Sequence, residues 1–410
     1  MAIAGRDTAS LEARAAALDA VDPLASFRER FAPTDPGIVY LDGNSLGRPP
    51  VASIDAVRAL AAQWSTRLIR GWDEGWIELP MRIGDRLARD VLGAGSGEVL
   101  VTDSTTVNLY RVASAALDAR PGRRAVVIER SEFPTDRYVL EGLARERDLE
   151  IRWLDGDPVE GLATSQVASA LGAGVALVIL SAVNYRSSAI ADMRGITDVA
   201  RGAGALVLWD LSHAAGSVPL DLEANGVELA VGCTYKYLNG GPGSPAFLYV
   251  RRELQAQLRP PIQGWMAQAD QFEMGPAFRR RDGIEGWLVG TPGILGLAAL
   301  EPAVELVAEA GIDAIRAKSV ALSAYAVALV EAWLAPLGCS LGSPGDPGRR
   351  GGAIAIRHAD ARRLTTALAG RGVITDFRAP DSVRIGMSPL TTSFDDVRRG
   401  LAAFRDLAGR

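Results

Sequence analysis

Short apolar runs recur through the middle of the chain and alternate with longer segments of helical pattern. Four such runs have the character of buried strands, at residues 124–129, 175–183, 205–209 and 246–250. Helical patterns lie between most of them, for example at residues 134–146 and 196–203. Strands that are apolar on both faces and alternate with helices form mostly parallel sheets with helices on both sides. The sequence therefore predicts an α/β fold built on a central, mostly parallel sheet.

The pattern changes after about residue 290. Two long helical patterns, at 294–310 and 312–334, precede a loop rich in Gly and Pro at 337–352. Shorter strand-like and helical patterns follow, at residues 353–357, 359–371, 373–375, 383–385 and 394–407. This second region predicts a smaller α+β domain. We therefore expect three divisions: an N-terminal segment, 1–50, packing on the small domain; a large domain, 51–290; and the small domain, 291–410.

Composition narrows the class of protein. Of the 410 residues, 48% are hydrophobic and 23% are charged, which is typical of a globular chain with a large core. A net charge of −5 argues against general nucleic-acid binding. The two cysteines, Cys233 and Cys339, are too few for a disulfide framework. The N-terminal stretch lacks the apolar region of a secretory signal, and no uninterrupted apolar run is as long as a membrane span. We expect a cytoplasmic protein with no metal site.

An acidic residue follows one of the apolar runs directly, in residues 208–216 (LWDLSHAAG). Ligands of open α/β sheets bind at the carboxyl ends of strands. A carboxylate at that position, Asp210, can hydrogen-bond a protonated pyridine nitrogen and keep the ring cationic. Taken alone, Asp210 is better explained as a residue that caps the following turn.

A lysine lies in a comparable place, in residues 233–243 (CTYKYLNGGPG), after the strand-like run 228–232. Most lysines are solvated surface residues. Lys236, however, lies between two tyrosines in an otherwise apolar stretch. A desolvated lysine has a lowered pKa and can form a Schiff base.

Hydroxyl residues follow a third strand-like run, 98–101, in residues 103–109 (DSTTVNL). They precede a helical pattern, so they have the character of a helix N-cap. The free N–H groups of such an end also favour a phosphate, although capping alone is the simpler explanation of a single match. Anion site, pyridine partner and lysine occur in the order expected for a pyridoxal-phosphate enzyme, and the combination is more specific than any one part.

Longer motifs agree with this interpretation, and the sequence resembles kynureninases, the bacterial ones especially, over nearly its whole length. The matching segments are 40–47 (YLDGNSLG), 68–72 (LIRGW), 103–108 (DSTTVN), 133–136 (FPTD), 184–186 (NYR), 210–216 (DLSHAAG), 235–243 (YKYLNGGPG), 264–265 (GW), 290–292 (GTP) and 393–397 (SFDDV).

The resemblance implies a role for particular residues. Lys236 would carry pyridoxal 5'-phosphate as a Schiff base and shuttle a proton, Asp210 would bind the pyridine nitrogen, and Tyr235 would assist catalysis and bind the phosphate. The remaining cofactor contacts would come from Thr105, Thr106, Phe133, Asp136, Ser181, His213, Trp265 and Thr291, the last from a partner subunit. Arg384 would pair with the substrate α-carboxylate, and Asn44 and Ser45 would also contact substrate.

The fold implied is the large pyridoxal-phosphate transferase type, fold type I, as a homodimer with active sites at the interface. The implied reaction is hydrolysis of the β,γ carbon–carbon bond of L-kynurenine, 3-hydroxykynurenine or a substituted analogue. Its products are an anthranilate and L-alanine, and it belongs to the kynurenine pathway of tryptophan catabolism and NAD biosynthesis. No nucleic acid or membrane is implied as a partner.

Several positions depart from the pattern usual in kynureninases. Gln268 stands where the family has His, Ser187 and Ser188 replace Thr-Gly, Trp287 replaces the Phe of an Arg-Phe pair, and Gly293 replaces Pro. These changes are either neutral drift or a reshaping of the pocket that receives the aryl group.

Other functions of the same fold remain open on the sequence alone. A cysteine desulfurase would need a nucleophilic cysteine on a mobile loop, and Cys339 is the candidate, although its surroundings favour a half-buried structural residue. An aminotransferase would need a stable half-reaction with a keto acid. A degenerate, regulatory protein is disfavoured because Lys236, Asp210 and Arg384 are all present.

Overall fold

Seven strands from the middle of the chain form the central sheet, in this computed structural model that describes residues 8–409. Their order is β2-β8-β7-β6-β5-β3-β4. Strands β7, β6, β5, β3 and β4 are parallel, whereas β8 is antiparallel to β2 and β7. The bounds are β2 (Val99–Val101), β3 (Ala125–Glu129), β4 (Glu150–Leu154), β5 (Val175–Ser181), β6 (Leu206–Asp210), β7 (Leu229–Gly232) and β8 (Phe247–Val250). The predicted α/β fold with a mostly parallel sheet is confirmed.

Both faces of this sheet are buried, because neighbouring residues of each strand enter two different cores. In β3, Val127 belongs to one hydrophobic cluster and Val126 to the other, as strand geometry requires. Helices α4 (Thr105–Asp118) and α5 (Pro134–Arg147) cover one face. Helices α3 (Leu79–Leu87), α6 (Thr164–Ala170), α7 (Met193–Gly202) and α9 (Ile294–Ala310) cover the other.

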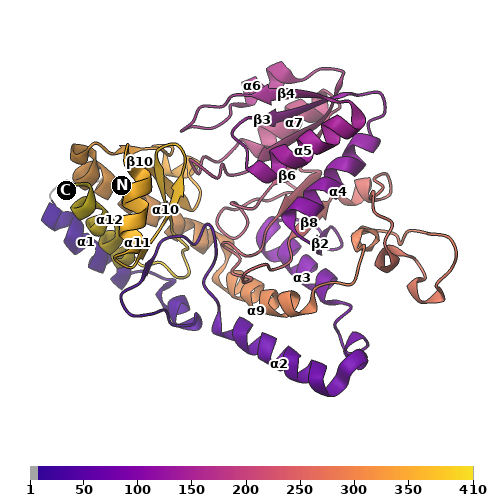
Figure 1. Ribbon diagram of the computed structural model, residues 1–410, viewed down its shortest axis with the longest axis horizontal. Coiled ribbons are helices and arrows are strands. Elements are labelled where there is room, and N and C mark those ends of the chain that lie inside the picture. Colours follow the sequence, from indigo (N-terminus) through magenta and orange to yellow (C-terminus); the bar gives the residue numbers. More distant parts are fainter. Residues whose placement is uncertain (1–7, 410) are drawn as a thin grey trace.

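A smaller α+β part lies beside the sheet, and the first and last helices of the described residues belong to it (Figure 1). It contains an antiparallel sheet in the order β12-β13-β10-β9. Its elements are α10 (Ile312–Leu329), β9 (Ser340–Leu341), β10 (Ala353–Arg357), α11 (Ala361–Ala369), β11 (Val373–Ile374), β12 (Asp376–Arg378), β13 (Ser382–Gly386) and α12 (Phe394–Ala408).

The N-terminal segment packs on this smaller part. Helix α1 (Thr8–Ala20) contributes Leu11 to the same hydrophobic cluster as α12, and β1 (Val39–Tyr40) pairs in parallel with β11. Residues 1–7, which belong to the segment predicted to pack here, lie outside the described residues. The chain then leaves through α2 (Val51–Arg67), which packs on α9 (Figure 1).

The observed elements differ from the expected ones in several places. The edge strand β4 and the short strand β12 are not among the predicted strands. Their sequences are partly exposed and charged, so the apolar pattern that identifies a buried strand is weak in them. Helix α9 lies within the range 291–410 expected for the small domain, but it contributes Leu297 and Val304 to the core of the large sheet. The domain boundaries at 50 and 290 stay predictions.

The helical stretch Ile312–Leu337 is long and apolar enough, by length and composition, to cross a membrane. Half of it is buried in the protein, where residues such as Leu322 and Leu329 pack in the core of the small part. The core helix of a folded domain meets the same criterion, and the packing of this stretch is of that kind.

Candidate active site

A cavity of about 310 Å³ lies at the carboxyl ends of the central strands. Asp210 is the last residue of β6 and Ser181 the last of β5, and the loops that follow β2, β3, β5, β6 and β7 supply the rest, as expected for a parallel sheet. The lining residues are Asp103, Ser104, Thr105, Thr106, Phe133, Thr135, Ser181, Val183, Tyr185, Asp210, Ser212, His213, Tyr235, Lys236, Gly243, Ser244 and Ala246. Eight predicted site residues therefore line one cavity: Thr105, Thr106, Phe133, Ser181, Asp210, His213, Tyr235 and Lys236. Asp136 does not line the cavity but lies near Asp210.

Lys236 lies in the turn that follows β7, with its amine inside this cavity. Its Nζ is 2.7 Å from Nε2 of His213 and 5.8 Å from the ring centroid of Phe133. Burial lowers the pKa of Lys236, and burial followed by the nearby Lys236 charge lowers the pKa of His213 well below its ordinary value. A buried amine of lowered pKa is a nucleophile that can attack an aldehyde.

The turn that carries Lys236 is held by the segment at residues 40–47. The N–H of Gly47 donates to the carbonyl oxygen of Tyr235 at 2.7 Å. A Cβ at Gly47 would lie 2.3 Å from the carbonyl oxygen of Lys236, so a side chain at this position would push the turn away. The motif at residues 40–47 thus positions the lysine through its backbone.

Two buried acidic side chains, Asp210 and Asp136, lie near each other, and Asp210 lines the cavity. Asp210 accepts a hydrogen bond from the N–H of Ser212 at 2.7 Å. Asp136 is fully buried, and neither of its oxygens has a hydrogen-bond partner within the described residues. Burial, then the charge of Asp210, raises the pKa of Asp136 well above its usual range. Ionising a buried acid without a hydrogen-bond partner is costly, so Asp136 favours its neutral form and Asp210 is the side chain that would accept from the N–H of a protonated pyridine ring.

The N-terminus of α4 offers a place for a phosphate. Ser104 caps the helix, its Oγ accepting from the N–H of Val107 at 3.3 Å. Thr105 and Thr106 follow in the first turn, where backbone N–H groups lack helical acceptors. The hydroxyl of Thr106 lies 3.4 Å from that of Thr135. The residues present therefore fit a pyridine ring carrying a phosphate and an aldehyde.

Arg384, predicted to bind a substrate carboxylate, lies in β13 and is 1% exposed. Its Nε and Nη2 donate to Asp376 at 3.0 and 2.5 Å. Nη2 also donates to the hydroxyl of Ser45 at 3.0 Å, and Nη1 donates to the carbonyl oxygen of Tyr185 at 2.5 Å. The amide oxygen of Asn44, in the orientation that satisfies both its polar atoms, accepts from Nη2 at 2.8 Å. Asn44, Ser45 and Arg384 are thus brought together, although they lie far apart in sequence.

Two further predicted cofactor residues, Trp265 and Thr291, also lie outside the cavity lining of this single chain. Trp265, in η4 (Trp265–Ala267), is 44% exposed and contacts Phe272 edge-to-face at 6.4 Å between ring centroids. Thr291 is exposed in the loop before α9. Their assignment to the cofactor stays a prediction that requires a second copy of the chain.

The positions that depart from the family pattern have different surroundings. Trp287 is fully buried in the core of the large part, away from the cavity lining. The side-chain oxygen of Gln268 accepts a hydrogen bond from the backbone N–H of Arg279 at 2.6 Å, and this contact stabilises the loop between the two residues. Ser188 adopts a left-handed backbone, φ 62°, and its carbonyl oxygen accepts from Gly351 of the small part. These contacts explain Trp287, Gln268 and Ser188 as structural residues.

Sequence reasoning missed two residues of the site, Glu132 and Tyr185. Glu132 is buried and accepts from the N–H and the hydroxyl of Ser181 at 2.7 and 2.5 Å. Burial, then the charge of Glu129, raises the pKa of Glu132 to about 8. Tyr185 lines the cavity and meets Phe133 edge-to-face at 5.3 Å. A glutamate beside a loop phenylalanine carries no signal of burial, whereas Tyr185 lay within a recognised motif.

Comparisons with known proteins agree with this geometry. A family model described as the kynureninase C-terminal domain matches residues 315–404. Kynureninases of Burkholderia pseudomallei and Burkholderia mallei are 43% identical over 401 residues, which covers 96% of this chain and 94% of theirs. The kynureninase of Pseudomonas fluorescens is 41% identical over 389 residues, covering 93% and 91%.

Solved structures of similar fold include two cysteine desulfurases. That of Thermococcus onnurineus superimposes with a TM-score of 0.82 at 17% identity, covering 94% of this chain and 98% of its own. CsdA of Escherichia coli superimposes with a TM-score of 0.78 at 18% identity, covering 95% and 98%. At this identity the likeness concerns the fold alone.

The fold, the buried lysine and the carboxylates at the strand ends define an enzyme that depends on pyridoxal phosphate, of fold type I. The sequence identity to curated relatives over nearly the full length is more specific. The chain belongs to the kynureninase family.

Proposed function

We propose that this protein hydrolyses the β,γ carbon–carbon bond of L-kynurenine, or of a ring-substituted kynurenine such as 3-hydroxykynurenine. The products are an anthranilate and L-alanine, with one water consumed. The observation that carries the proposal is that the buried residues Lys236 and Arg384 are linked by the same residue, Tyr185. Tyr185 lines the cavity of Lys236 and accepts from Arg384 through its carbonyl oxygen, in a chain 43% identical to kynureninases.

Bound pyridoxal phosphate supplies an electron sink conjugated to the α-carbon of an amino acid. Asp210 and Phe133 would hold the ring, and the N-terminus of α4 would hold the phosphate. Nζ of Lys236 would take and return the proton at the α-carbon. Its lowered pKa favours the neutral amine that this requires.

Cleavage also needs an acid near the γ-carbonyl oxygen. Tyr235 lines the cavity, and burial raises its pKa, so its hydroxyl stays protonated and can donate. Such a donor stabilises the charge that develops when water adds to the carbonyl. Arg384 holds the α-carboxylate, which fixes the α-carbon relative to Lys236.

The working unit we propose is a cytoplasmic homodimer acting in tryptophan catabolism. Trp265 and Thr291 of one copy would reach the cavity of the other. Three large apolar side chains near the end of α2, Trp64, Leu68 and Ile69, are mostly exposed, and a second copy would cover them. Light scattering coupled to gel filtration tests this state, and a monomer at working concentration would contradict it.

The decisive experiment incubates the cofactor-loaded protein with L-kynurenine and follows fluorescent anthranilate and alanine. We expect turnover that falls by at least about 10²–10⁴-fold in Lys236→Ala. Borohydride reduction should attach the cofactor to Lys236, and Lys318, the other lysine of the chain, serves as an internal control. Cofactor fixed on Lys236 without anthranilate would refute the kynurenine substrate. It would point to another aryl or acyl substrate, selected by changed positions such as Ser187 and Gly293.

Cysteine desulfurase activity has weaker support. Cys339 is buried in the core of the small part, and burial raises the pKa of its thiol to about 11. A desulfurase needs an accessible thiolate, and the cysteine next to the lysine turn, Cys233, is buried as well.

A further inference from the structure

The guanidinium of Arg384 is already fully engaged before any substrate arrives. Nε and Nη2 donate to Asp376, Nη2 also donates to Ser45 and Asn44, and Nη1 donates to the carbonyl oxygen of Tyr185. A substrate carboxylate would therefore join an existing ion pair, and it would not find an isolated cation. The charge balance of the whole cluster then decides how the carboxylate binds.

The cluster contains two cations and two acids. Arg378 lies beside Arg384, and its Nη2 is 2.7 Å from Oδ2 of Asp376. The second acid is Asp42, which lies on the segment at residues 40–47 and forms a β-bridge with Gly386. With both acids ionised the cluster is neutral, and an added carboxylate gives it a net charge of −1. Leaving such a charge in a buried site is costly.

The two acids differ in their partners. Asp376 accepts from Arg384 twice, contacts Arg378 and accepts from the hydroxyl of Ser45 at 3.1 Å. Asp42 has one buried oxygen, Oδ1, without any hydrogen-bond partner in the described part of the chain. Burial, then the charge of Asp376, raises the pKa of Asp42 to about 6. Asp42 is therefore the acid that ionises less readily.

We propose that Asp42 takes up a proton when an amino-acid carboxylate binds at Arg384, so that the cluster stays electrically neutral. The inference rests on the proposed placement of the substrate carboxylate at Arg384. The titratable and charged groups that face Asp42 are Tyr40 on its own segment, Tyr237 after the lysine turn, and Asp376, Arg378 and Arg384 from β12 and β13. Among these, Asp42 is the carboxyl with an unsatisfied oxygen.

The sign of the pH dependence follows directly. Above about pH 6, Asp42 is mostly ionised in the free enzyme and must regain its proton when the carboxylate binds. The dissociation constant then rises up to about tenfold per pH unit, until the pKa of Asp42 in the complex is passed. Asp42→Asn keeps the shape and removes the charge, so binding should become tighter at high pH and lose this dependence.

The test uses the cofactor-loaded enzyme and 4-(2-aminophenyl)-4-oxobutanoate, a kynurenine without the α-amine. This probe presents a carboxylate but lacks the α-amine through which an amino acid reacts with the cofactor's aldehyde. Calorimetric titration in two buffers of different ionisation heat, at about pH 7.5, should give uptake approaching one proton per site. The absorption of the bound cofactor should stay unchanged. Asp42→Asn should take up no proton, and Asp381→Asn, which changes a more exposed acid of the turn after β12, should behave as the wild type.

The outcomes separate this inference from the proposed function, because kynurenine turnover is measured in parallel. Probe binding without proton uptake overturns the inference and leaves the hydrolase intact. Uptake that persists in Asp42→Asn, or that changes the cofactor spectrum, assigns the proton to another group and also overturns it. A probe that fails to bind an enzyme that hydrolyses kynurenine places the carboxylate elsewhere. If Asp42→Asn does not fold, the wild-type proton count decides alone.

Discussion

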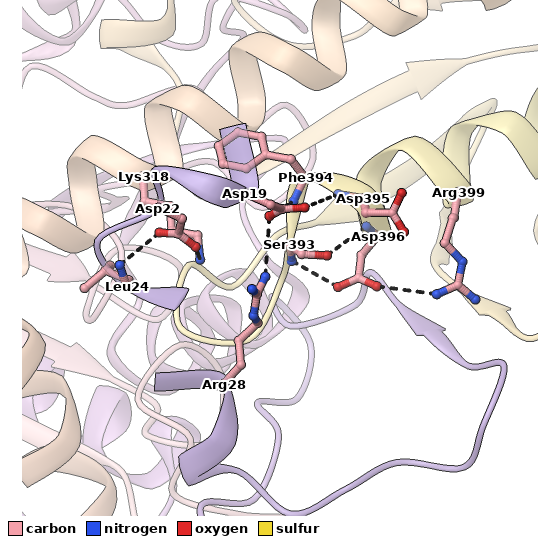
Figure 2. Close-up of polar contacts among 10 residues, drawn as sticks. All are labelled: Asp19, Asp22, Leu24, Arg28, Lys318, Ser393, Phe394, Asp395, Asp396 and Arg399. Carbon is pink, nitrogen blue, oxygen red and sulfur yellow. Dashed lines mark hydrogen bonds and ion pairs between the residues drawn. The ribbon is translucent and has the colours of Figure 1, made fainter. Parts of the chain in front are cut away.

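A buried ion pair ties the N-terminal segment to the small part, and it offers the sharpest test of the packing. Nζ of Lys318 lies 2.7 Å from Oδ2 of Asp22, and the two side chains are 3% and 0% exposed. The other oxygen of Asp22 accepts from the N–H of Leu24 at 2.9 Å. Nearby, Asp19 accepts from the first N–H groups of α12, as Figure 2 shows. These contacts hold the segment that leads to Asn44 and Ser45.

Replacing Lys318 by Met would leave the carboxylate of Asp22 buried without a counter-ion. Removing one partner of a buried pair costs about 3–5 kcal/mol, because the remaining charge is neither solvated nor paired. An exposed pair of the same chain provides the contrast. Arg30 and Glu309 lie 3.1 Å apart with side chains 51% and 55% exposed, and Arg30→Met should cost no more than about 1 kcal/mol.

Urea unfolding of the cofactor-loaded protein, followed by far-UV circular dichroism, measures both changes. A loss below about 1 kcal/mol in Lys318→Met would refute the reasoning, since it would mean that water reaches Asp22. The double variant Lys318→Met with Asp22→Leu should recover most of the loss, because both charges are then gone. If the double variant is as unstable as the single one, lost packing and not an unpaired charge is the cause.

Three further changes test other residues. Ser188 has a left-handed backbone conformation, which glycine adopts at lower cost, so Ser188→Gly should raise the free energy of unfolding by up to about 1 kcal/mol. A clear destabilisation would show that the loss of the serine hydroxyl outweighs the relief of backbone strain. Glu132 has a folded pKa of about 8, above its value of 4.5 in the unfolded chain, so wild-type stability is lost as pH rises through this window. Glu132→Gln should therefore gain stability relative to the wild type from about pH 5 to about pH 9 in urea titrations, and a constant difference would contradict this. Cys339→Ala should keep kcat/KM for kynurenine and lose about 1–2 kcal/mol of stability, whereas lost activity would favour a sulfur-transfer reaction.

Much of the fold and the chemical core of the site could be predicted from sequence, because both depend on local pattern. Apolar runs between helical segments identify buried strands, and parallel strands bring their carboxyl ends to one edge of the sheet. Asp210 and Lys236 follow two such strands and are therefore expected to line the same crevice. The half-exposed edge strand β4 was missed for the complementary reason, since its charged residues blur the apolar signal.

Burial and long-range contact were decided only by the tertiary structure. The sequence alone determined which residue types stand at the strand ends and thereby the cofactor chemistry. It did not show that Arg384 is already hydrogen-bonded to Asp376. That ion pair joins two neighbouring strands and includes Ser45, which lies more than 300 residues earlier in the chain. Nor did it show that Trp287 fills a core while Trp265 stays exposed. The same side chain has a different pKa and role in water and in a packed interior, and only packing determines which surroundings it has.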